Sequence, residues 1–402
     1  MALMPVAEAL QRVLAEARAL PAEAVALNDA LGRVLTDDVT ALRTQPPAAV
    51  SAMDGYAVRA ADVGTGPVTL TLIGEVAAGH PFEGEVGSGQ AARIFTGGVM
   101  PAGADTVVIQ ELTARAGDTV TIQKATAKGR NVRGRGIDFG QGQILLQKGR
   151  RLTDRDLMLA AAMNHPALPV HRRPKVAVLG TGDELVAPGS TPGPGEIVYS
   201  NGFALMAMAR SEGAEVSDLG IARDRVEAIA AGVRRARDWG ADILVTTGGA
   251  SVGEHDLVQK ALAAEGLDLS FWRVAMRPGR PMMHGRLGAM QVLGVPGNPV
   301  ASYVCAFLFL VPLIRRLVGR ADIERPLETA RVGRDLPAND ERADYLRATL
   351  EPGPDGPVAT PLPDQDSSLM APLAMASCLV IREPNAPAAP AGSSCVILKL
   401  AL

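Results

Sequence analysis

The chain has few aromatic residues and almost no net charge. Phe, Tyr and Trp make up 3% of its 402 residues, and 40 Lys and Arg stand against 43 Asp and Glu, a formal charge of −3. Nucleic-acid binders usually carry a basic surplus and stack bases on aromatic rings, so both counts argue against a nucleic-acid partner. The basic residues are 34 Arg and only 6 Lys in an Ala-, Gly- and Pro-rich background, which we interpret as compositional bias of the source genome.

Cysteine and long apolar runs are also scarce. Cys305, Cys378 and Cys395 form no C-x-x-C pair and are odd in number, which argues against a disulfide framework or a thiolate metal site and fits a reducing compartment. The longest apolar run, Val300–Ile314, is shorter than the ~20 residues that a membrane-spanning helix needs. The acidic N-terminal segment lacks the basic region of a signal peptide. We therefore expect a cytoplasmic protein without a membrane partner, and a buried core helix at this run.

The length and the apolar content suggest several folded domains. Hydrophobic residues make up 47% of the chain and charged residues 21%, as in folded proteins. Apolar residues recur at helical spacing over the first forty residues, and Thr153 with Asp156 has the spacing of a helix capping box. Short β-rich runs lie between these segments. The pattern predicts a discontinuous helical domain, residues 1–43 and 148–172, interrupted by a β-rich insertion domain, residues 44–147.

Strands and helices then alternate. Apolar strands at 175–179, 242–246 and 290–295 are separated by amphipathic helices, which predicts a parallel α/β sheet covered on both faces, residues 173–322. The remaining short β runs, rich in Pro and Gly, predict a small β-barrel-like C-terminal domain, residues 323–402. The fold class is therefore multidomain α/β plus β.

Three glycine-rich loops follow strands of the expected sheet. They are Gly180–Leu185, Gly248–Asp256 and Gly294–Pro299. Ligands of open α/β sheets collect beyond the carboxyl ends of the strands, and glycines let backbone N–H groups approach an anion. None of the loops matches a Walker or Rossmann fingerprint, and a plain strand-to-helix turn also accounts for any one of them. The positions that we expect to bind the ligand are Gly248, Gly249, Ser251, Pro296, Asn298 and Pro299.

Acidic residues follow the glycines in two of these loops. They are Asp183 and Glu184 in one, and Glu254 and Asp256 in the other. Acids beside a phosphate cradle repel the ligand unless a hard cation bridges them, and oxygen ligands suit Mg²⁺. Asp224, at a helix start, either joins this group or caps the helix.

Arginine and turn motifs complete the candidates. Arg277 and Arg280 lie on a stretch stiffened by prolines, and either bind an oxyanion or form a solvated turn. The segments 51–56 and 96–98 are typical of tight turns. The arginine-rich segment 129–138 fits an anion site or a basic surface loop. No histidine lies near a candidate nucleophile in the sequence.

Taken together, these segments resemble the MoeA family, the molybdopterin molybdenumtransferases, which include the E domain of gephyrin. The matching motifs occur in family order along nearly the whole chain. They are SAMDGYAVR (51–59), RIFTG (93–97) with PAGAD (101–105), NVRGRGID (131–138), TGDEL (181–185), TGGASVGEHD (247–256), RPGRP (277–281) and GVPGNP (294–299).

The resemblance implies an elongated homodimer of four-domain subunits. In such a dimer, the α/β molybdopterin-binding domain would face the partner's β insertion across a cleft. The implied reaction inserts molybdate into the dithiolene of adenylylated molybdopterin, with Mg²⁺-dependent hydrolysis of the phosphoanhydride and release of AMP. The implied partners are a molybdopterin adenylyltransferase and molybdoenzyme-maturation proteins.

The resemblance also implies roles for residues. Asp54 and Thr96 would reach the cleft from the β insertion, with Asp138 near them. Glu184, Asp224 and Asp256 would line the pyrophosphate and metal site.

Arg277 and Arg280 stand where the family usually has two lysines, and would hold molybdate or phosphate. In the C-terminal region Arg342, Arg347 and Ser368 resemble a looser family pattern with an implied oxyanion contact.

Two other functions stay open at this point. An adenylyltransferase of molybdopterin would consume ATP, but it would need neither the insertion nor the C-terminal domain. A non-catalytic pterin-binding scaffold would have no use for the acids at Glu184, Asp224 and Asp256.

Overall fold

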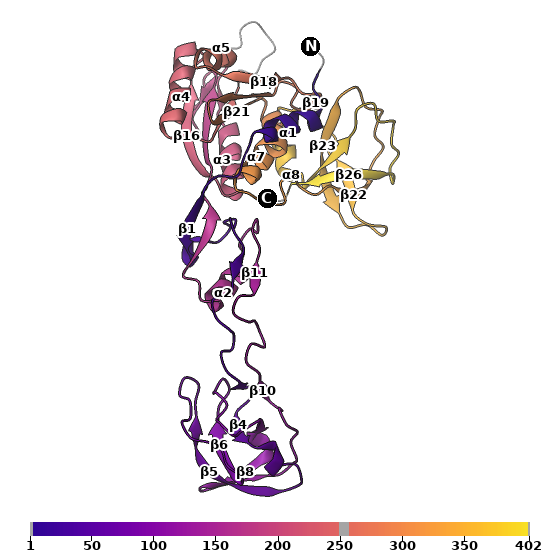
Figure 1. Ribbon diagram of the computed structural model, residues 1–402. Helices are drawn as coiled ribbons and strands as arrows, with labels where there is room; N and C mark the ends of the chain where they lie inside the picture. The colour runs from indigo at the N-terminus through magenta and orange to yellow at the C-terminus, as the bar shows by residue number, and fades with distance from the viewer. Residues whose placement is uncertain (1–2, 249–256, 401–402) are drawn as a thin grey trace.

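The computed structural model describes residues 3–248 and 257–400, and it shows an elongated chain (Figure 1). A large α/β body and the C-terminal domain lie side by side at one end. A narrow stalk leads from the α/β body to a separate β domain at the other end. The α/β domain, the β insertion and the C-terminal domain expected from the sequence are all present.

The α/β body is built on a six-stranded sheet in the order β16-β13-β17-β21-β20-β18. The first four strands, β16 (Glu215–Ala222), β13 (Lys175–Thr181), β17 (Ile243–Thr247) and β21 (Met290–Val295), are parallel. The last two, β20 (Met283–Leu287) and β18 (Asp268–Trp272), are antiparallel to their neighbours.

Helices cover both faces of this sheet, because its strands alternate apolar side chains between two cores. Val176 and Val178 of β13 point into one core, and Ala177 and Leu179 point into the other. Helices α3 (Asn201–Ser211), α6 (Pro299–Cys305) and α7 (Val311–Leu317) cover the first face. Helices α4 (Val226–Asp238) and α5 (Leu257–Ala264) cover the second.

The long apolar run is the central helix of this body. Segments α6, η4 (Ala306–Leu310, a π-helical turn) and α7 are continuous over Pro299–Leu317. The segment has the length and hydropathy of a membrane span, but 83% of it is buried inside the protein. The prediction of a buried core helix is confirmed. The π-helical turn immediately precedes Pro312, whose ring removes an N–H from the α-helical pattern.

The N-terminal residues contain less helix than the sequence predicts. Helix α1 (Val6–Ala15) is present and packs on the α/β body, but the run after Pro21 is a strand, β1 (Ala22–Ala26). This prediction of a helix was wrong because β1 pairs along its whole length with β12 (Ala167–His171), and that pairing outweighs the helix propensity of alanine.

The rest of the stalk contains β2 (Val39–Thr40) paired with β11 (Ile144–Leu146), and α2 (Asp154–Ala162). Helix α2 has the expected capping box of Thr153 and Asp156.

The insertion contains a six-stranded sheet in the order β7-β4-β6-β5-β9-β8. Its strands are β4 (Gly55–Val58), β5 (Val68–Val76), β6 (Gln90–Ile94), β7 (Thr106–Ile109), β8 (Thr113–Ala116) and β9 (Thr119–Ile122). The predicted tight turn at 51–56 is only partly correct, because Gly55 and Tyr56 begin the buried strand β4. Gly55 is required there, since a Cβ would lie 2.0 Å from the Val108 carbonyl oxygen. A two-stranded pair, β3 (Val50–Ser51) and β10 (Val132–Arg133), lies where the insertion meets the stalk.

The C-terminal domain is a small closed barrel, as expected. Pairing runs around the ring β23 (Ala343–Glu351), β24 (Val358–Pro361), β22 (Glu328–Val332), β26 (Ser394–Lys399), β25 (Cys378–Arg382) and back to β23. Strand β19 (Met276–Arg277) of the α/β body adds to β23, and helix α8 (Met370–Met375) packs against α6, so the two domains meet on both sides.

Candidate functional site

A cavity of about 690 Å³ lies at the carboxyl ends of β13, β17 and β21. The loops after these three strands line it together, and the C-terminal domain contributes Ser368 and Met370. The predicted residues Glu184, Gly248, Pro296, Asn298 and Pro299 are among its lining residues. The expected gathering of the three loops is therefore found. Gly249, Ser251, Glu254 and Asp256 lie outside the described residues.

Gly248 has a backbone conformation that other residues rarely adopt. Its φ is +96°, and a Cβ would lie 2.3 Å from the carbonyl oxygen of Thr181. The β17 loop therefore packs directly against the end of β13. Only glycine allows this contact, which exposes backbone rather than side chains to the cavity.

Asn201 joins two of the loops from the start of helix α3. Its Nδ2 donates to Thr247 Oγ1 at 3.1 Å and to the carbonyl of Gly297 at 2.7 Å. Sequence reasoning missed this residue. A polar side chain in the first turn of a helix that follows a short strand was the available signal.

The C-terminal domain is hydrogen-bonded to the third loop. Asn298 Nδ2 donates to Ser367 Oγ at 2.9 Å, and the backbone N–H of Val300 donates to the carbonyl of Ser367 at 3.0 Å. Ser368 donates its hydroxyl to Asp366 at 2.7 Å. The cavity is thus a cleft between two domains, and its wall from the C-terminal domain is fixed in position.

Carboxylates gather beside this cleft. The backbone N–H of Asp224 donates to Asp183 at 3.2 Å. Burial, with the charges of Asp183 and Glu184, raises the pKa of Asp224 above its ordinary value. Asp224 does not cap a helix, because α4 begins at Val226 and its N-cap position is Arg225. Capping therefore does not explain Asp224.

This group of acids fits a magnesium ion that also binds phosphate. Among the described residues, no three Asp, Glu, His or Cys side chains are arranged as a metal site of their own. Mg²⁺ in proteins usually takes one or two carboxylates and completes its shell with water and substrate phosphates. Glu184 and Asp224 match that donor set.

The two arginines of the RPGRP loop have different surroundings. The Arg277 guanidinium is bound to Asp344 and lies 3.5 Å from Asp340, both in the C-terminal domain. The Arg280 side chain is exposed and makes no hydrogen bond or ion pair to any residue that the structure describes, although its backbone carbonyl accepts from the N–H groups of Val274 and Met282. Arg280 is therefore available for an oxyanion, whereas Arg277 connects the two domains.

Arg342 and Arg347 are also occupied by the protein. Arg342 pairs with Asp340 at 2.6 Å. Arg347 is 1% exposed and donates to the carbonyls of Leu369 (2.9 Å), Asp364 (3.2 Å) and Asp366 (2.9 Å). In this arrangement Arg347 holds the loop that carries Ser368.

Asp54 and Thr96 meet in the insertion. One carboxylate oxygen of Asp54 accepts from the Thr96 backbone N–H at 2.7 Å and from its hydroxyl at 2.8 Å. These two bonds, with a smaller contribution from the Arg93 charge, lower the pKa of Asp54 although the group is exposed. Asp138 is exposed beyond β10, and its backbone N–H donates to the carbonyl of Gln45. Within the described part of the chain, Asp138 makes no hydrogen bond or ion pair with Asp54 or Thr96.

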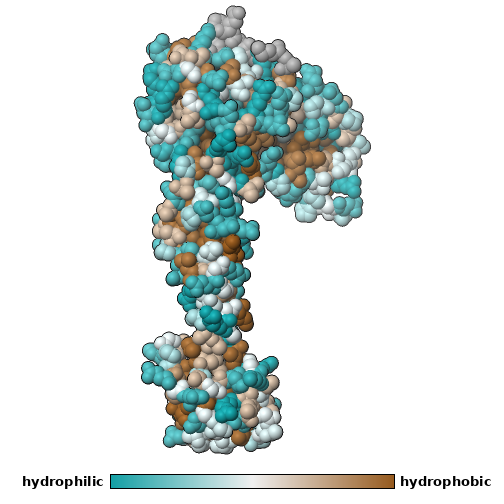
Figure 2. Space-filling model, in the orientation of Figure 1, coloured by the Kyte–Doolittle hydropathy of each residue, from teal (hydrophilic) through white to brown (hydrophobic). Residues whose placement is uncertain are grey.

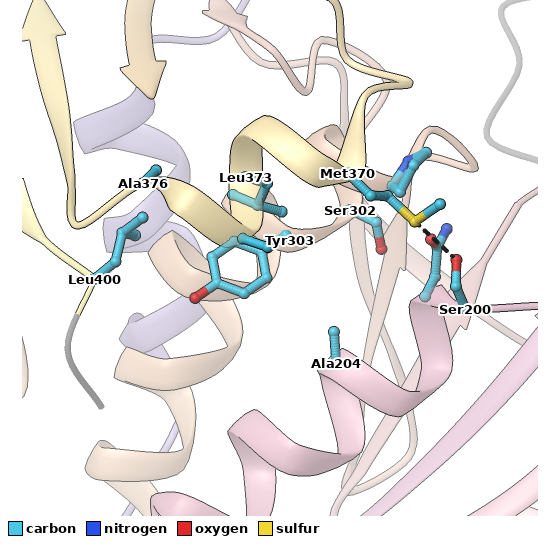
Figure 3. A pocket seen from close by; sticks show the side chains of 11 residues that line it. Ser200, Ala204, Ser302, Tyr303, Met370, Leu373, Ala376 and Leu400 are labelled. Atoms are coloured by element: carbon cyan, nitrogen blue, oxygen red, sulfur yellow. Dashed lines mark hydrogen bonds between the residues drawn. The ribbon is translucent and has the colours of Figure 1, made fainter. Parts of the chain in front are cut away.

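A second, mainly apolar cavity of about 380 Å³ adjoins the main one (Figure 3). The two share Ser200, Asn201, Pro299 and Met370. The side chains of Tyr303 and Leu373 face each other across it, and Ser200 donates to the Met370 sulfur at 3.4 Å. Figure 2 shows apolar residues gathered where the α/β body and the C-terminal domain meet. The cleft therefore combines a polar end with an apolar one, as ligand sites commonly do.

Family models match this chain in three consecutive segments. The MoeA N-terminal region (domain I and II) matches residues 4–164, a probable molybdopterin binding domain matches 177–316, and the MoeA C-terminal region (domain IV) matches 329–400.

Proteins similar to this chain carry the name molybdopterin molybdenumtransferase or MoeA. The chain is 38% identical to a molybdopterin molybdenumtransferase of Nostoc sp. over 82% of this chain and 77% of that protein. It is 34% identical to one of Bacillus subtilis over 94% and 90%. Among solved structures, a molybdopterin biosynthesis MoeA protein from Pyrococcus horikoshii superposes with a TM-score of 0.87 at 30% identity, over all of both chains.

Proposed function

The chain belongs to the MoeA family and is a molybdopterin molybdenumtransferase, and from this premise we propose that the cleft between the α/β body and the C-terminal domain is where molybdate meets adenylylated molybdopterin. The observation that carries the proposal is the convergence of three strand-end loops and Glu184 on one cavity. Asp224 lies beside the first of these loops, where its backbone N–H donates to Asp183. Molybdate inserts into the dithiolene, the phosphoanhydride is hydrolysed, and AMP leaves.

Toward molybdate, the residues of the cleft supply charge and position rather than ligands to the molybdenum. Molybdate is a dianion, so it needs cationic donors, and the unpaired guanidinium of Arg280, next to the lining residue Pro281, supplies one. The sulfur ligands belong to the pterin. Cys305, in helix α6, does not act as a thiolate ligand, because burial raises the pKa of its thiol and keeps it protonated.

Glu184 and Asp224, with Asp256, would hold Mg²⁺ together with the substrate phosphates. The ion supplies charge neutralisation for the phosphoanhydride. The carboxylates themselves keep the cation at the polar end of the cleft. The pKa of Asp224, raised by burial and by the charges of Asp183 and Glu184, supports this role, because a nearby cation would relieve that repulsion.

A second copy of the chain would complete the site as a homodimer. Asp54 precedes β4 and Thr96 follows β6, two strands of the insertion, which lies at the far end of the stalk from the cleft of its own chain (Figure 1). In a homodimer, the insertion of one copy would bring its Asp54 and Thr96 to the cleft of the other copy. Exposed apolar side chains on and beside the stalk support such pairing: Leu31, Leu42, Ile137, Ile144 and Met158.

The same proposal gives the protein its setting in the cell. A molybdopterin adenylyltransferase supplies the substrate, and molybdoenzyme-maturation proteins receive the product. The three thiols, with no described disulfide, fit a cytoplasmic enzyme.

The direct test mixes purified protein with adenylylated molybdopterin, molybdate and Mg²⁺, and follows AMP release and metal-cofactor formation. Both should appear, and both should fall by at least tenfold in Glu184→Gln, with Glu196→Gln on the neighbouring exposed loop as the control. ATP consumption with molybdopterin and no AMP release from the adenylylated form would instead indicate an adenylyltransferase. Pterin binding without any turnover would indicate a scaffold.

A further inference from the structure

A third cavity, of about 430 Å³, shares the RPGRP loop with the main cleft. Arg277 and Pro278 form one wall, and the C-terminal barrel forms the rest. The side chains that give this cavity its chemistry are Arg277, Arg334, Asn339, Asp344, Gln365 and Arg382. None of the residues already placed around the phosphates lines it.

Asp344 is the unusual group in this cavity. It is 3% exposed, and its Oδ2 is bound to Arg277, while its Oδ1 is buried and has no hydrogen-bond partner. A buried carboxylate oxygen without a donor is costly, so such atoms are usually satisfied by protein, water or ligand. An N–H donor from a bound molecule would satisfy it.

The polar walls are held in place before any ligand arrives. Asn339 Nδ2 donates to the carbonyls of Arg342 (2.8 Å), Arg382 (3.1 Å) and Glu383 (2.9 Å). Arg382 is 8% exposed and donates to the carbonyl of Pro337 at 3.0 Å. These bonds of the half-buried Asn339 and the buried Arg382 fix loops, which lowers the ordering cost of binding.

Two loops of the chain each contribute residues both to this cavity and to the main cleft. Arg277 and Pro278 line it, and Pro281 of the same loop lines the main cleft. Gln365 and Asp366 line it, and Ser368 of that loop lines the main cleft. The two cavities therefore share the RPGRP loop and the 365–370 segment as walls.

We propose that this third cavity binds the pyrimidine edge of the pterin, with Asp344 and Arg277 as the residues that recognise it. The inference rests on the proposed function, since it takes the pyrophosphate to lie in the main cleft. A 2-amino-4-oxo pyrimidine edge presents two adjacent N–H donors, the amino group and N3–H, followed by a carbonyl acceptor. A carboxylate accepts the two donors, and a guanidinium donates to the carbonyl.

The volume and the charge also fit. The cavity, at about 430 Å³, lies within the range of about 300–1,000 Å³ that ligand sites usually have, and a bicyclic pterin ring fills only part of it. Adenine, the other ring of the substrate, presents only one donor beside an unprotonated ring nitrogen on its corresponding edge. That nitrogen would face the carboxylate lone pairs, so Asp344 selects against it.

The test compares two fluorescent probes on the full chain, 6-hydroxymethylpterin and 6-hydroxymethyllumazine. The lumazine has a carbonyl in place of the 2-amino group and a proton on N1, and it keeps N3–H and the 4-carbonyl. The native protein should bind the pterin at least about tenfold more tightly, the effect of one charged hydrogen bond replaced by repulsion. Asp344→Asn should abolish this preference. Asp340→Asn is the matched control, because Asp340 also lies near Arg277 but does not line the cavity, and it should keep the preference.

The outcomes separate the recognition of the pterin from folding and from turnover. Equal affinity of the native protein for both probes overturns the proposal, even if Asp344→Asn does not fold. A preference that survives Asp344→Asn overturns it too, and so does displacement of the bound pterin by adenosine. Loss of AMP release with an intact pterin preference would count against the proposed reaction and not against this site.

Discussion

Replacing Arg347 by lysine should loosen the loop that carries Ser368 without exposing new surface. The Arg347 side chain donates to the Leu369, Asp364 and Asp366 carbonyls and contacts Gln365 at 3.4 Å. A lysine ammonium cannot reproduce the planar fork, so we expect two of these bonds to be lost. At about 1 kcal/mol for each bond, the loop should become easier to open by about 2 kcal/mol.

Hydrogen exchange measured by mass spectrometry on a peptide that covers residues 364–369 tests this expectation. An opening free energy that is about 2 kcal/mol lower corresponds to exchange that is about 30-fold faster. Arg342→Lys is the matched control, because Arg342 pairs with an exposed carboxylate, Asp340, and such pairs contribute about 0–1 kcal/mol. Unchanged exchange in Arg347→Lys would refute the view that Arg347 holds this loop.

Three further perturbations have definite expected results. Gly248→Ala places a Cβ against the Thr181 carbonyl at a φ of +96°, so AMP release should fall at least about tenfold, and wild-type rates would contradict the close packing. The raised pKa of Asp224 means that its charged form opposes folding above the ordinary Asp range, and that this cost disappears as the pH falls and the carboxyl is protonated. Asp224→Asn should therefore raise the melting temperature at pH 7 in the absence of Mg²⁺ but not near pH 3, and destabilisation at pH 7 would contradict the repulsion. Thr96→Val removes one of the two bonds to Asp54 and should move the pKa of Asp54 upward toward its ordinary value in an NMR titration, whereas an unchanged pKa would show that the hydroxyl does not stabilise the charge.

The sequence predicts the α/β body well because periodicity reports which face of an element is buried. The strands near 175–179, 242–246 and 290–295 and the buried run at 300–314 occur as expected. Sequence reasoning failed where pairing partners decide the structure. Ala22–Ala26 is a strand only because β12 lies beside it, and Gly55 begins a strand because the Val108 carbonyl needs the space of a missing Cβ.

The candidate site divides in the same way. Glycine-rich loops and the acids that follow them can be recognised from local composition, so the gathering of Glu184, Gly248 and Asn298 around one cavity could be predicted. Partnerships between distant segments could not. Arg277 and Arg280 look equivalent in the sequence, and only the position of Asp344, 67 residues beyond Arg277, shows that one is paired and the other is open.

The measurement that tests the central claim most directly is complementation between two inactive variants. Asp54→Asn removes the carboxylate of the insertion, and Glu184→Gln removes one at the cleft. If each site combines the cleft of one copy with the insertion of the other, a mixed dimer has one site with both changes and one with neither. Co-expressed in equal amounts, the two variants should recover about a quarter of the wild-type rate of AMP release. A mixture that stays as inactive as either variant alone, although mixed dimers form, would contradict a site shared between two copies.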